Sequence, residues 1–452
     1  MMKLFGTDGI RATAGTAPLD AQTICRVGAA LVRVLPAQGP PPRILIGGDT
    51  RESCGWIEEE LARGLTAEGA TVVSVGVTPT PGVAYLTRSE GVDAGIVISA
   101  SHNSYQDNGI KIFSGRGEKL DEAFEQRIEA MVADPGWRVA TRAEVVRDRR
   151  PALRDHYVDH LLKIFPRAGS LGGSRLVIDC ANGATTTVAP ELFRRLGFDL
   201  VVIGDEPNGR NINLDCGSTH LGRLQKKVLD VSARLGVAFD GDGDRALFVD
   251  HRGRPVDGDA VLLIAGVHLQ NENRLPGNAV VATVMSNIGL ELALKKRNIE
   301  LCRAPVGDKY VMEQMLARGI ALGGEQSGHI IFADHLFTGD GIGTALQVLR
   351  IMEVTGQELE TLASALVTYP QILVNVRVRE RVDYMTIPAI AESIRRVEER
   401  VNGQGRLLIR YSGTEPLLRI MIEGQNDSEI QQWANDIAAA VTAALGQRAS
   451  PA

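Results

Sequence analysis

Strand-like and helix-like segments alternate along the first 370 residues, and this alternation limits the fold more than any other feature of the chain. Short apolar runs such as RILIGG (43–48), TVVSVGV (71–77) and GIVISA (95–100) are separated by longer amphipathic stretches. Strands that alternate with helices in this way are typical of α/β units with mostly parallel sheets. The alternation therefore predicts an α/β fold built from several such units.

The alternation divides into three similar units, and the pattern changes after Tyr369-Pro370. The segments RDRRP and HRGRPVDGD predict the two earlier boundaries. The last segment contains ILVNVRV, one helix, the strand pair LLIRY and LRIMI, and a final helix, which is typical of a small α+β domain. We predict three α/β domains and one α+β domain, over 1–150, 151–255, 256–370 and 371–452.

The composition excludes several functional classes. Apolar residues make up 44% and charged residues 23% of the 452 residues, which are globular values. A formal net charge of −6 gives no general attraction to nucleic acid. Five widely spaced cysteines without a CxxC pair argue against a disulfide framework or a zinc site, and for a reducing compartment.

Membrane association and secretion are not indicated either. The N-terminus, MMKLFGTDGIR, lacks an apolar signal core, and no apolar run approaches the length of about 18 residues that a membrane span needs. We therefore predict a cytoplasmic protein without nucleic-acid or membrane partners. The sequence leaves open whether the chain forms a homo-oligomer.

The first chemical candidate is the polar segment SASHNSYQDNGIKIF (99–113), which follows the apolar run GIVI. It is longer than a plain turn of about two to five residues, and Asn108-Gly109 predicts a turn before a second strand, IKIF. Because loops at strand ends often hold functional groups, Ser101 and His102 are candidates. The same residue types also form ordinary turns, so this segment alone leaves a structural interpretation open.

The second candidate is FDGDGDRA (239–246), in which Asp240, Asp242 and Asp244 alternate with glycines after an apolar run. Neighbouring carboxylates repel one another unless a cation neutralises them. The glycines allow the backbone to curl so that the oxygens face one point, and oxygen ligands in this number suit Mg2+. The segment therefore favours a magnesium site over a solvated acidic turn.

Two other motifs in this segment do not fit. Gly241, Gly243 and Ala246 satisfy a dinucleotide-binding GxGxxA pattern, but the strand-like run ALFVD follows where that motif requires a helix. An EF-hand loop requires glycine after the third acid and glutamate at its twelfth position, where this chain has Arg245 and His251.

The third candidate, GGEQSGHI (323–330), is a polar loop between two apolar runs. Its Glu325 and Ser327 have the hydrogen-bonding groups that recognise sugar hydroxyls. A hairpin turn would explain the glycines of this loop, but it would not require Glu, Gln, Ser and His together.

The fourth candidate, RYSGTEPLLRI (410–420), predicts a phosphate site. Ser412, Gly413 and Thr414 offer hydroxyl and backbone N–H donors, and Arg410 and Arg419 add positive charge and bidentate geometry. A hairpin turn with incidental arginines is the alternative.

In this order, SASHNSYQDNGIKIF, DGDGDR, GGEQSGHI and RYSGTEPLLR resemble the four signature loops of the α-D-phosphohexomutases. The segments FGTDGIR, CANGA (180–184) and VGDKYV (306–311) resemble the branch of that family that acts on glucosamine phosphates. The similarity covers essentially the whole chain. It implies three α/β domains and a C-terminal α+β domain resembling the TATA-binding protein, arranged around a central cleft.

The resemblance also implies roles for individual residues. Ser101 would be carried as phosphoserine and would donate its phosphoryl group to a phosphosugar, and the resulting bisphosphate would return its other phosphoryl group. One Mg2+ per chain would be bound by the three aspartates and a phosphoserine oxygen of Ser101. The remaining assignments are Arg11, Lys111 and Arg245 for phosphoryl oxygens, His102 or His329 for proton transfer with the choice open, Glu325 and Ser327 for the sugar, and Arg410, Ser412, Gly413, Thr414 and Arg419 for the phosphate that is not reacting.

Two alternatives to this assignment remain. In the phosphoglucomutase/phosphomannomutase branch the sugar loop commonly carries Met where this chain has Gln326, whose amide is compatible with a polar substituent on the sugar. A non-catalytic phosphosugar-binding protein would lack Ser101 or a metal-binding aspartate, and this chain has lost neither. Ala12, where the family typically has Gly, and Ser104-Tyr105, where Pro is usual, are departures that concern loop geometry.

Overall fold

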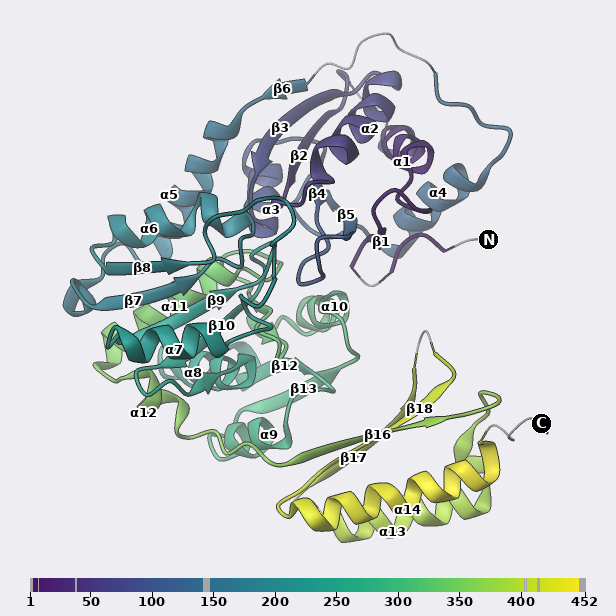
Figure 1. The fold of residues 1–452 in the computed structure, drawn as a ribbon, viewed down its shortest axis with the longest axis vertical. Helices are drawn as coiled ribbons and strands as arrows, with labels where there is room; N and C mark the ends of the chain where they lie inside the picture. The colour runs from purple at the N-terminus through teal and green to yellow at the C-terminus, as the bar shows by residue number, and fades with distance from the viewer. Residues whose placement is uncertain are drawn as a thin grey trace. The chain divides into compact units, whose positions relative to one another are not determined.

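The computed structural model describes residues 3–6, 8–36, 39–140, 147–401, 403, 405–412 and 415–446. The chain forms two compact units (Figure 1). The larger unit comprises Met1–Ser286 and Arg297–Ala365, and the smaller unit comprises Asn287–Lys296 and Leu366–Ala452. The larger unit contains three mixed sheets, and the smaller unit contains one antiparallel sheet.

The first sheet has the strand order β1-β5-β4-β2-β3-β6. Its strands are β1 Ile10–Thr13, β2 Arg43–Gly48, β3 Thr71–Val77, β4 Ala94–Ile98, β5 Asp107–Ser114 and β6 Arg147–Arg149, with helices α1 Ala21–Val34, α2 Cys54–Ala67, α3 Thr80–Ser89 and α4 Glu122–Ala133. Strands β2, β3 and β4 are parallel, while β5 returns antiparallel to β4. The predicted apolar strands are confirmed, but β1 and α1 have no counterpart in the prediction.

The second and third sheets repeat this plan in a smaller form, with orders β11-β10-β9-β7-β8 and β13-β12-β14-β15. The second sheet contains β7 Arg175–Asp179, β8 Asp199–Ile203, β9 Leu235–Phe239, β10 Ala246–Asp250 and β11 Pro255–Val256, with α5 Arg154–Ile164, α6 Ala189–Arg195 and α7 Gly222–Asp230. The third contains β12 Ala279–Thr283, β13 Glu300–Ala304, β14 Leu322–Gly324 and β15 Ile330–Phe332, with α8 Gly258–Asn271, α10 Asp308–Arg318, α11 Gly341–Thr355 and α12 Leu359–Ala363.

The smaller unit has the antiparallel order β16-β18-β17. Its strands are β16 Gln371–Arg377, β17 Arg406–Tyr411 and β18 Leu417–Glu423, and its helices are α9 Ile288–Lys295, α13 Pro388–Val401 and α14 Asp427–Leu445. Helices α13 and α14 lie side by side along one face of this sheet and bury an apolar core with it (Figure 1). The predicted α+β character of the C-terminal segment is confirmed.

All four candidate loops occupy the same place in their sheets. Each one connects two antiparallel strands: β4 to β5, β9 to β10, β14 to β15, and β17 to β18. In the first three sheets the strand before the loop also pairs with a parallel neighbour. In the first three sheets each loop therefore begins where a buried strand ends, as the alternation of apolar and polar segments predicted, whereas β17 is only partly buried.

One local prediction is wrong. Asn108-Gly109 is not a turn but part of β5, because β1 extends the sheet and pairs Ala12 with Asn108 and Arg11 with Gly109.

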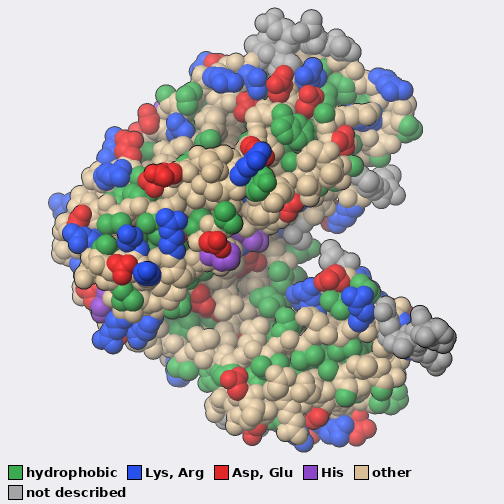
Figure 2. All heavy atoms as spheres, in the orientation of Figure 1, with side chains coloured by type: hydrophobic (Ala, Val, Ile, Leu, Met, Phe, Trp, Pro, Cys, Tyr) green, Lys and Arg blue, Asp and Glu red, His purple; other side chains and the backbone are tan. Residues whose placement is uncertain are grey.

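On the face drawn in Figure 2, basic and acidic side chains are interspersed over the larger unit. Among the described residues, no helix combines the length and the apolar character that spanning a bilayer requires.

Candidate active site

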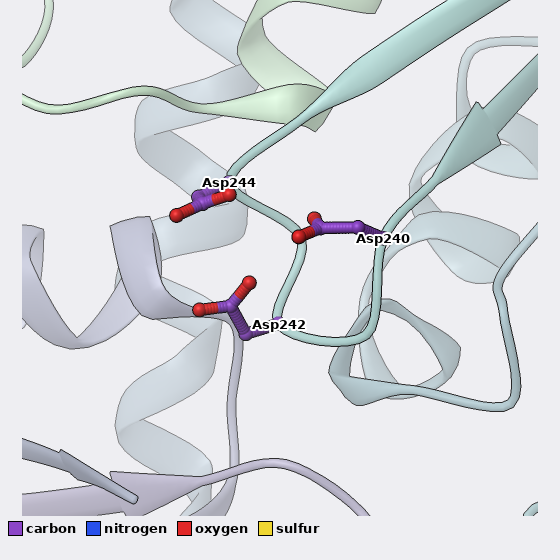
Figure 3. A group of neighbouring side chains, drawn as sticks. All are labelled: Asp240, Asp242 and Asp244. Carbon is purple, nitrogen blue, oxygen red and sulfur yellow. The ribbon is translucent and has the colours of Figure 1, made fainter. Parts of the chain in front are cut away.

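The β9–β10 loop directs three carboxylates toward a common space (Figure 3). Asp240, Asp242 and Asp244 are buried, and each offers one oxygen within 4.8 Å of the others. Gly243 adopts φ +73°, a conformation that a glycine takes without strain. At Gly241 a Cβ atom would lie 2.6 Å from the carbonyl oxygen of Ser101, so the close approach of these two loops requires glycine there. The glycines thus let the backbone curl as predicted.

The donor set of this loop fits a divalent cation. Oδ1 of Asp242 and Oδ1 of Asp244 are buried and have no hydrogen-bond partner among the residues that the structure describes. Burial, together with the neighbouring carboxylates of Asp244 and Asp242, raises the pKa of Asp240 well above its ordinary value. A hard cation bound between the three carboxylates would satisfy the orphaned oxygens and remove this repulsion, and Mg2+ prefers such ligands.

Lys111 lies beside this loop, and its ammonium group offsets part of the negative charge of the aspartates. Its Nζ atom is 2.8 Å from Asp242, 3.3 Å from Asp244 and 3.0 Å from Asp8. Burial would lower the pKa of Lys111, but the carboxylates around it outweigh burial and raise the pKa well above its ordinary value. Lys111 is therefore an ammonium ion at neutral pH, fixed next to the metal-ligand candidates.

Ser101 lies at the start of the β4–β5 loop and points at the three aspartates. Its buried hydroxyl donates a 2.5 Å hydrogen bond to Oδ2 of Asp240, and its backbone has φ +52°. Nδ1 of His102 is 3.4 Å from the Ser101 hydroxyl. Burial lowers the pKa of His102 to about 4, and the positive charges of Arg245 and Arg11 act in the same direction. His102 is therefore a neutral imidazole at neutral pH, able to accept a proton.

Arg11 and Arg245 reach the same region with donors that remain unused. Arg11 forms an ion pair with Asp8, and Nε of Arg245 is 3.8 Å from Asp244. Within the described part of the chain, the Nε atom of each arginine is buried without a hydrogen-bond partner. Two guanidinium groups with unused N–H donors beside an acidic loop can bind the oxygens of a phosphoryl group.

The predicted sugar loop connects β14 to β15, and hydrogen bonds within the protein position its polar groups. Glu325 accepts a hydrogen bond from the backbone of Gly307 (3.2 Å) and another from the hydroxyl of Ser327 (3.3 Å). The amide of Gln326 donates to Asp257 (3.1 Å), the residue that caps α8. The side chain of Gln326 is thus engaged within the protein, which weakens the argument from its amide to a polar substituent on the sugar.

His329 follows the sugar loop and connects it to the metal loop. Its Nδ1 atom is 3.6 Å from Asp244, and its Nε2 atom accepts a 3.0 Å hydrogen bond from the backbone of Gly339. Both ring nitrogens therefore have partners within the protein. A Cβ atom at Gly339 would lie 2.5 Å from the imidazole ring, so only glycine leaves room for it.

In the smaller unit, the β17–β18 hairpin carries the predicted phosphate-binding residues. Arg410 and Arg419 stand directly opposite each other in the strand register, where like charges are unfavourable unless an anion lies between them. Arg419 donates to the hydroxyl of Ser412 (3.3 Å), and its Nε atom is buried without a hydrogen-bond partner among the residues described here. Gly413 and Thr414 lie outside the described residues.

Sequence reasoning missed several residues that hold these groups. Thr80, at the start of α3, donates from its hydroxyl to Oδ2 of Asp242 (2.7 Å) and from its backbone to the Asp242 carbonyl (2.8 Å). Asp49, Arg51 and Asn213 hold the Ser101 loop through hydrogen bonds. Arg51 and Asn213 donate to the carbonyl of Ser101, and Asp49 accepts from the hydroxyl of Ser99. One signal was available: Asp49 and Arg51 directly follow the buried run RILIGG, a place where charged residues need partners.

Models of one known protein family match most of the chain. Four models of the phosphoglucomutase/phosphomannomutase family match in order: alpha/beta/alpha domain I at residues 2–138, domain II at 155–253, domain III at 257–369, and the C-terminal domain at 373–440. Each match contains one of the four candidate loops.

Similar proteins agree with these matches. A phosphoglucosamine mutase of Solibacter usitatus is 49% identical over 98% of this chain and 99% of its own, and one of a Geobacter species is 46% identical over 99% and 100%. Among solved structures, a phosphoglucomutase/phosphomannomutase family protein of Burkholderia thailandensis has a TM-score of 0.78 at 24% identity, covering 98% of this chain and 97% of its own. The N-acetylphosphoglucosamine mutase of Aspergillus fumigatus, solved with GlcNAc-6P and magnesium, has a TM-score of 0.68 at 19% identity, covering 97% and 95%. The matches over the whole chain, together with the four loops that the fold positions, show that the chain belongs to the phosphoglucomutase/phosphomannomutase family of α-D-phosphohexomutases, and within it to the phosphoglucosamine mutases.

Proposed function

We propose that this protein interconverts glucosamine 6-phosphate and glucosamine 1-phosphate, with Ser101 as the carrier of the phosphoryl group. The observation that supports this most directly is the 2.5 Å hydrogen bond from the Ser101 hydroxyl to Asp240. A hydroxyl held against three buried carboxylates that fit a divalent cation is the arrangement that phosphoryl transfer requires.

The reaction consists of two transfers in opposite directions. In the first, the bond between phosphorus and Oγ of phosphorylated Ser101 breaks and Oγ takes up a proton, while phosphorus forms a bond to the free hydroxyl of the sugar monophosphate, which loses its proton. The product is the sugar 1,6-bisphosphate. In the second, the other phosphoryl group of that bisphosphate moves to Oγ of Ser101, whose hydroxyl loses its proton, and the sugar oxygen that the phosphoryl group leaves takes up a proton. The phosphoserine is therefore regenerated in each cycle.

Residues around Ser101 stabilise the charge on the transferred group. Mg2+ bound by Asp240, Asp242 and Asp244 would supply positive charge to phosphoryl oxygens, the usual main contribution in phosphoryl transfer. Arg11 and Arg245 offer their unused guanidinium N–H donors to the same oxygens. Lys111 remains an ammonium ion beside the metal ligands and adds a further positive charge.

His102 is the better supported of the two histidines for proton transfer. Its Nδ1 atom is 3.4 Å from the Ser101 hydroxyl, and its lowered pKa leaves it neutral before it accepts a proton. In His329, by contrast, one ring nitrogen faces Asp244 and the other accepts the hydrogen bond from Gly339. We assign proton transfer to His102 and an orienting role toward Asp244 to His329.

The remaining residues bind the sugar and its second phosphate. Glu325 and Ser327 present a carboxylate and a hydroxyl that suit the sugar 3- and 4-hydroxyls. Arg410, Arg419 and Ser412 of the smaller unit, with Gly413 and Thr414, bind the phosphate that is not reacting. The preference for glucosamine phosphate rests on the relatives, because the amide of Gln326 is engaged with Asp257. We assign the protein to the cytoplasm on the basis of its widely spaced cysteines, as a sequence-based expectation.

A side-by-side assay of three sugar phosphates tests this function. Purified protein is primed with the cognate 1,6-bisphosphate and supplied with the 6-phosphates of glucosamine, glucose or mannose, and formation of each 1-phosphate is followed by 31P NMR. We expect turnover that is fastest with glucosamine 6-phosphate. Turnover that is fastest with glucose or mannose phosphate would move the protein to the phosphoglucomutase/phosphomannomutase function, and absence of turnover with all three would overturn the catalytic assignment.

A further inference from the structure

Ser101 has a backbone conformation that its own side chain does not favour. Its φ of +52° lies in the left-handed region, which is uncommon for residues other than glycine and persists only where the surroundings enforce it. With this backbone, the hydroxyl reaches Oδ2 of Asp240. The groups that enforce the conformation therefore determine where the hydroxyl points.

The N–H group of Ser101 is held through Ser99 by a buried carboxylate. The backbone N–H of Ser101 donates to the Ser99 hydroxyl (2.9 Å), and that hydroxyl donates to Oδ2 of Asp49 (2.5 Å). Asp49 lies at the end of β2, next to β4, and its side chain is fully buried. The peptide group before Ser101 is thus held, through the hydroxyl of Ser99, to Asp49 at the end of β2.

The carbonyl group of Ser101 is held by the partner of that carboxylate. Arg51 is fully buried and forms an ion pair with Asp49, with 3.0 Å between Nη1 and Oδ2. Its Nη2 atom donates to the carbonyls of Ser101 (3.2 Å) and Asn103 (2.7 Å), and its Nε atom donates to the carbonyl of Asp107 (2.8 Å). One guanidinium group therefore binds the loop at three places along its length.

Asn213 holds the same carbonyls from the second sheet's side. Its amide donates to the carbonyl oxygens of Ser101 (2.9 Å) and Asn103 (3.0 Å). Its own backbone donates to the carbonyl of Ala181, within the CANGA segment. Gly241 leaves the space for this contact, because a Cβ atom there would lie 2.7 Å from the Asn213 amide.

We propose that Asp49, Arg51 and Asn213 are positioning residues that hold Ser101 in the left-handed conformation and so aim its hydroxyl at the aspartate loop. None of the three reaches the Ser101 hydroxyl itself, and they act through the peptide groups on both sides of it. The proposal rests on the proposed role of Ser101 as phosphoryl carrier. It also gives a function to the CANGA segment, because the carbonyl of Ala181 in that segment accepts a hydrogen bond from the backbone N–H of Asn213.

A positioning role of Arg51 and a merely stabilising role of this buried arginine predict different kinetics. Misplacement of a reacting group by about 1 Å can lower the rate of the chemical step by about a hundredfold. Loss of Arg51 should therefore lower kcat per folded molecule and leave KM for the sugar phosphate nearly unchanged. A merely stabilising residue would lower the melting temperature without this separation of kcat and KM.

Arg26 provides a matched control. It also donates to several main-chain carbonyls, those of Met131, Val132, Asp134 and Trp137 at the end of α4, and takes no part in the Ser101 loop. We compare Arg51→Lys with Arg26→Lys, each with Mg2+ and the 1,6-bisphosphate. For both variants we measure the melting temperature, kcat, KM and, by intact mass, the fraction phosphorylated.

We expect Arg51→Lys to lose about tenfold to a hundredfold in kcat with KM changed less than about threefold, and Arg26→Lys to keep its kcat. Both variants are assayed at a temperature well below their melting temperatures, so that each is folded. Equal kcat in the two variants under these conditions would overturn the proposal. The activity of Ser101→Ala is measured separately. If that variant is active, the proposed carrier role of Ser101 is wrong, whatever the Arg51 variant shows.

Asn213→Gly is a second, milder test that does not depend on Arg51 variants folding. Glycine accepts the φ of +58° at this position and lacks the side chain that carries the amide, and Asn298→Gly, at an exposed residue with φ +56°, is its control. We expect Asn213→Gly to lower kcat by about tenfold with little change in KM. Unchanged kcat in Asn213→Gly would remove Asn213 from the positioning set.

Discussion

The hydroxyl of Ser101 donates a hydrogen bond of 2.5 Å to Oδ2 of Asp240, although 139 positions separate the two residues in the sequence. Ser101 lies in the β4–β5 loop of the first sheet, and Asp240 lies in the β9–β10 loop of the second. Both loops connect antiparallel strands at an equivalent place in their sheets. The repeated plan of the two sheets thus brings the predicted phosphoryl carrier to the predicted metal ligands.

The first prediction concerns Ser101→Ala. If Ser101 carries the phosphoryl group, intact mass spectrometry of the wild type should show a species heavier by one phosphate, and the variant should lack it. Turnover should fall by at least about a thousandfold, because the variant lacks the hydroxyl that carries the phosphoryl group. Ser104→Ala, an exposed serine of the same loop, should keep both the heavier species and the activity. Near-wild-type turnover in Ser101→Ala would rule out the mechanism.

The second prediction concerns the metal. Chelation with EDTA should abolish turnover and added Mg2+ should restore it, because without a cation the three carboxylates repel an incoming phosphate dianion. Asp242→Asn should weaken Mn2+ binding, measured by electron paramagnetic resonance, by at least about tenfold while the melting temperature changes little. Asp230→Asn, at an exposed position of α7, should bind Mn2+ like the wild type. Full activity in chelator would count against the site.

The parts of the site that could be predicted are those that local sequence encodes. The Ser101 loop and the aspartate loop each follow an apolar run, and their residue types suggested a chemical use, although the residues of the Ser101 loop alone also allowed an ordinary turn. The convergence of Asp240, Asp242 and Asp244 follows from alternation with glycine, and the loop has that geometry.

The parts that could not be predicted depend on long-range pairing. The extension of β5 through Asn108-Gly109 requires β1, almost one hundred residues earlier, and so the turn predicted there is wrong. The burial of Arg51 follows from carbonyls of a loop about fifty residues later. The engagement of Gln326 with Asp257 could not be inferred either, because nothing in the sugar loop itself indicates where that amide points.

The third prediction concerns the phosphate site of the smaller unit. Arg419→Ala should mainly raise KM for the sugar monophosphate, because the arginine is assigned to the phosphate that is not reacting. Loss of one charge-assisted hydrogen bond costs about 1.5–3 kcal/mol, which corresponds to about tenfold or more in KM. Ser412→Ala should act in the same direction, and Arg379→Ala, an exposed arginine paired with Glu380, should leave KM unchanged. An unchanged KM in both site variants would leave the hairpin a structural role.

The fourth prediction concerns the pH dependence of stability. Burial raises the pKa of Asp340 to about 6, even though the backbone of Gly343 and the hydroxyl of Tyr157 donate to it. A carboxyl whose folded pKa is raised stabilises the fold only while it is protonated, so this contribution is lost as pH rises through about 6. Relative to Asp340→Asn, the wild type should therefore lose about 1–2 kcal/mol between pH 5 and pH 7.5.

Urea unfolding of both proteins at the two pH values measures this difference. Asp20→Asn is the matched control, since Asp20 also caps a helix. Burial would raise the pKa of Asp20, but its hydrogen bonds with Thr23 outweigh burial and lower it, so its contribution is already complete above pH 5. A stability difference between the wild type and Asp340→Asn that stays constant with pH would contradict the raised pKa.

The last prediction concerns which sugar the enzyme prefers. Glucose, mannose and glucosamine present the same 3- and 4-hydroxyls, so Glu325 and Ser327 cannot distinguish among them. We expect kcat/KM for glucosamine phosphate to exceed that for the other two by at least about tenfold, or ~1.4 kcal/mol of transition-state discrimination. Glu325→Gln should lower kcat/KM for all three sugars by a similar factor, because it weakens a contact that they share. If that variant instead changed the ratio between the sugars, Glu325 would have to sense carbon 2, and its assignment to the common hydroxyls would be wrong.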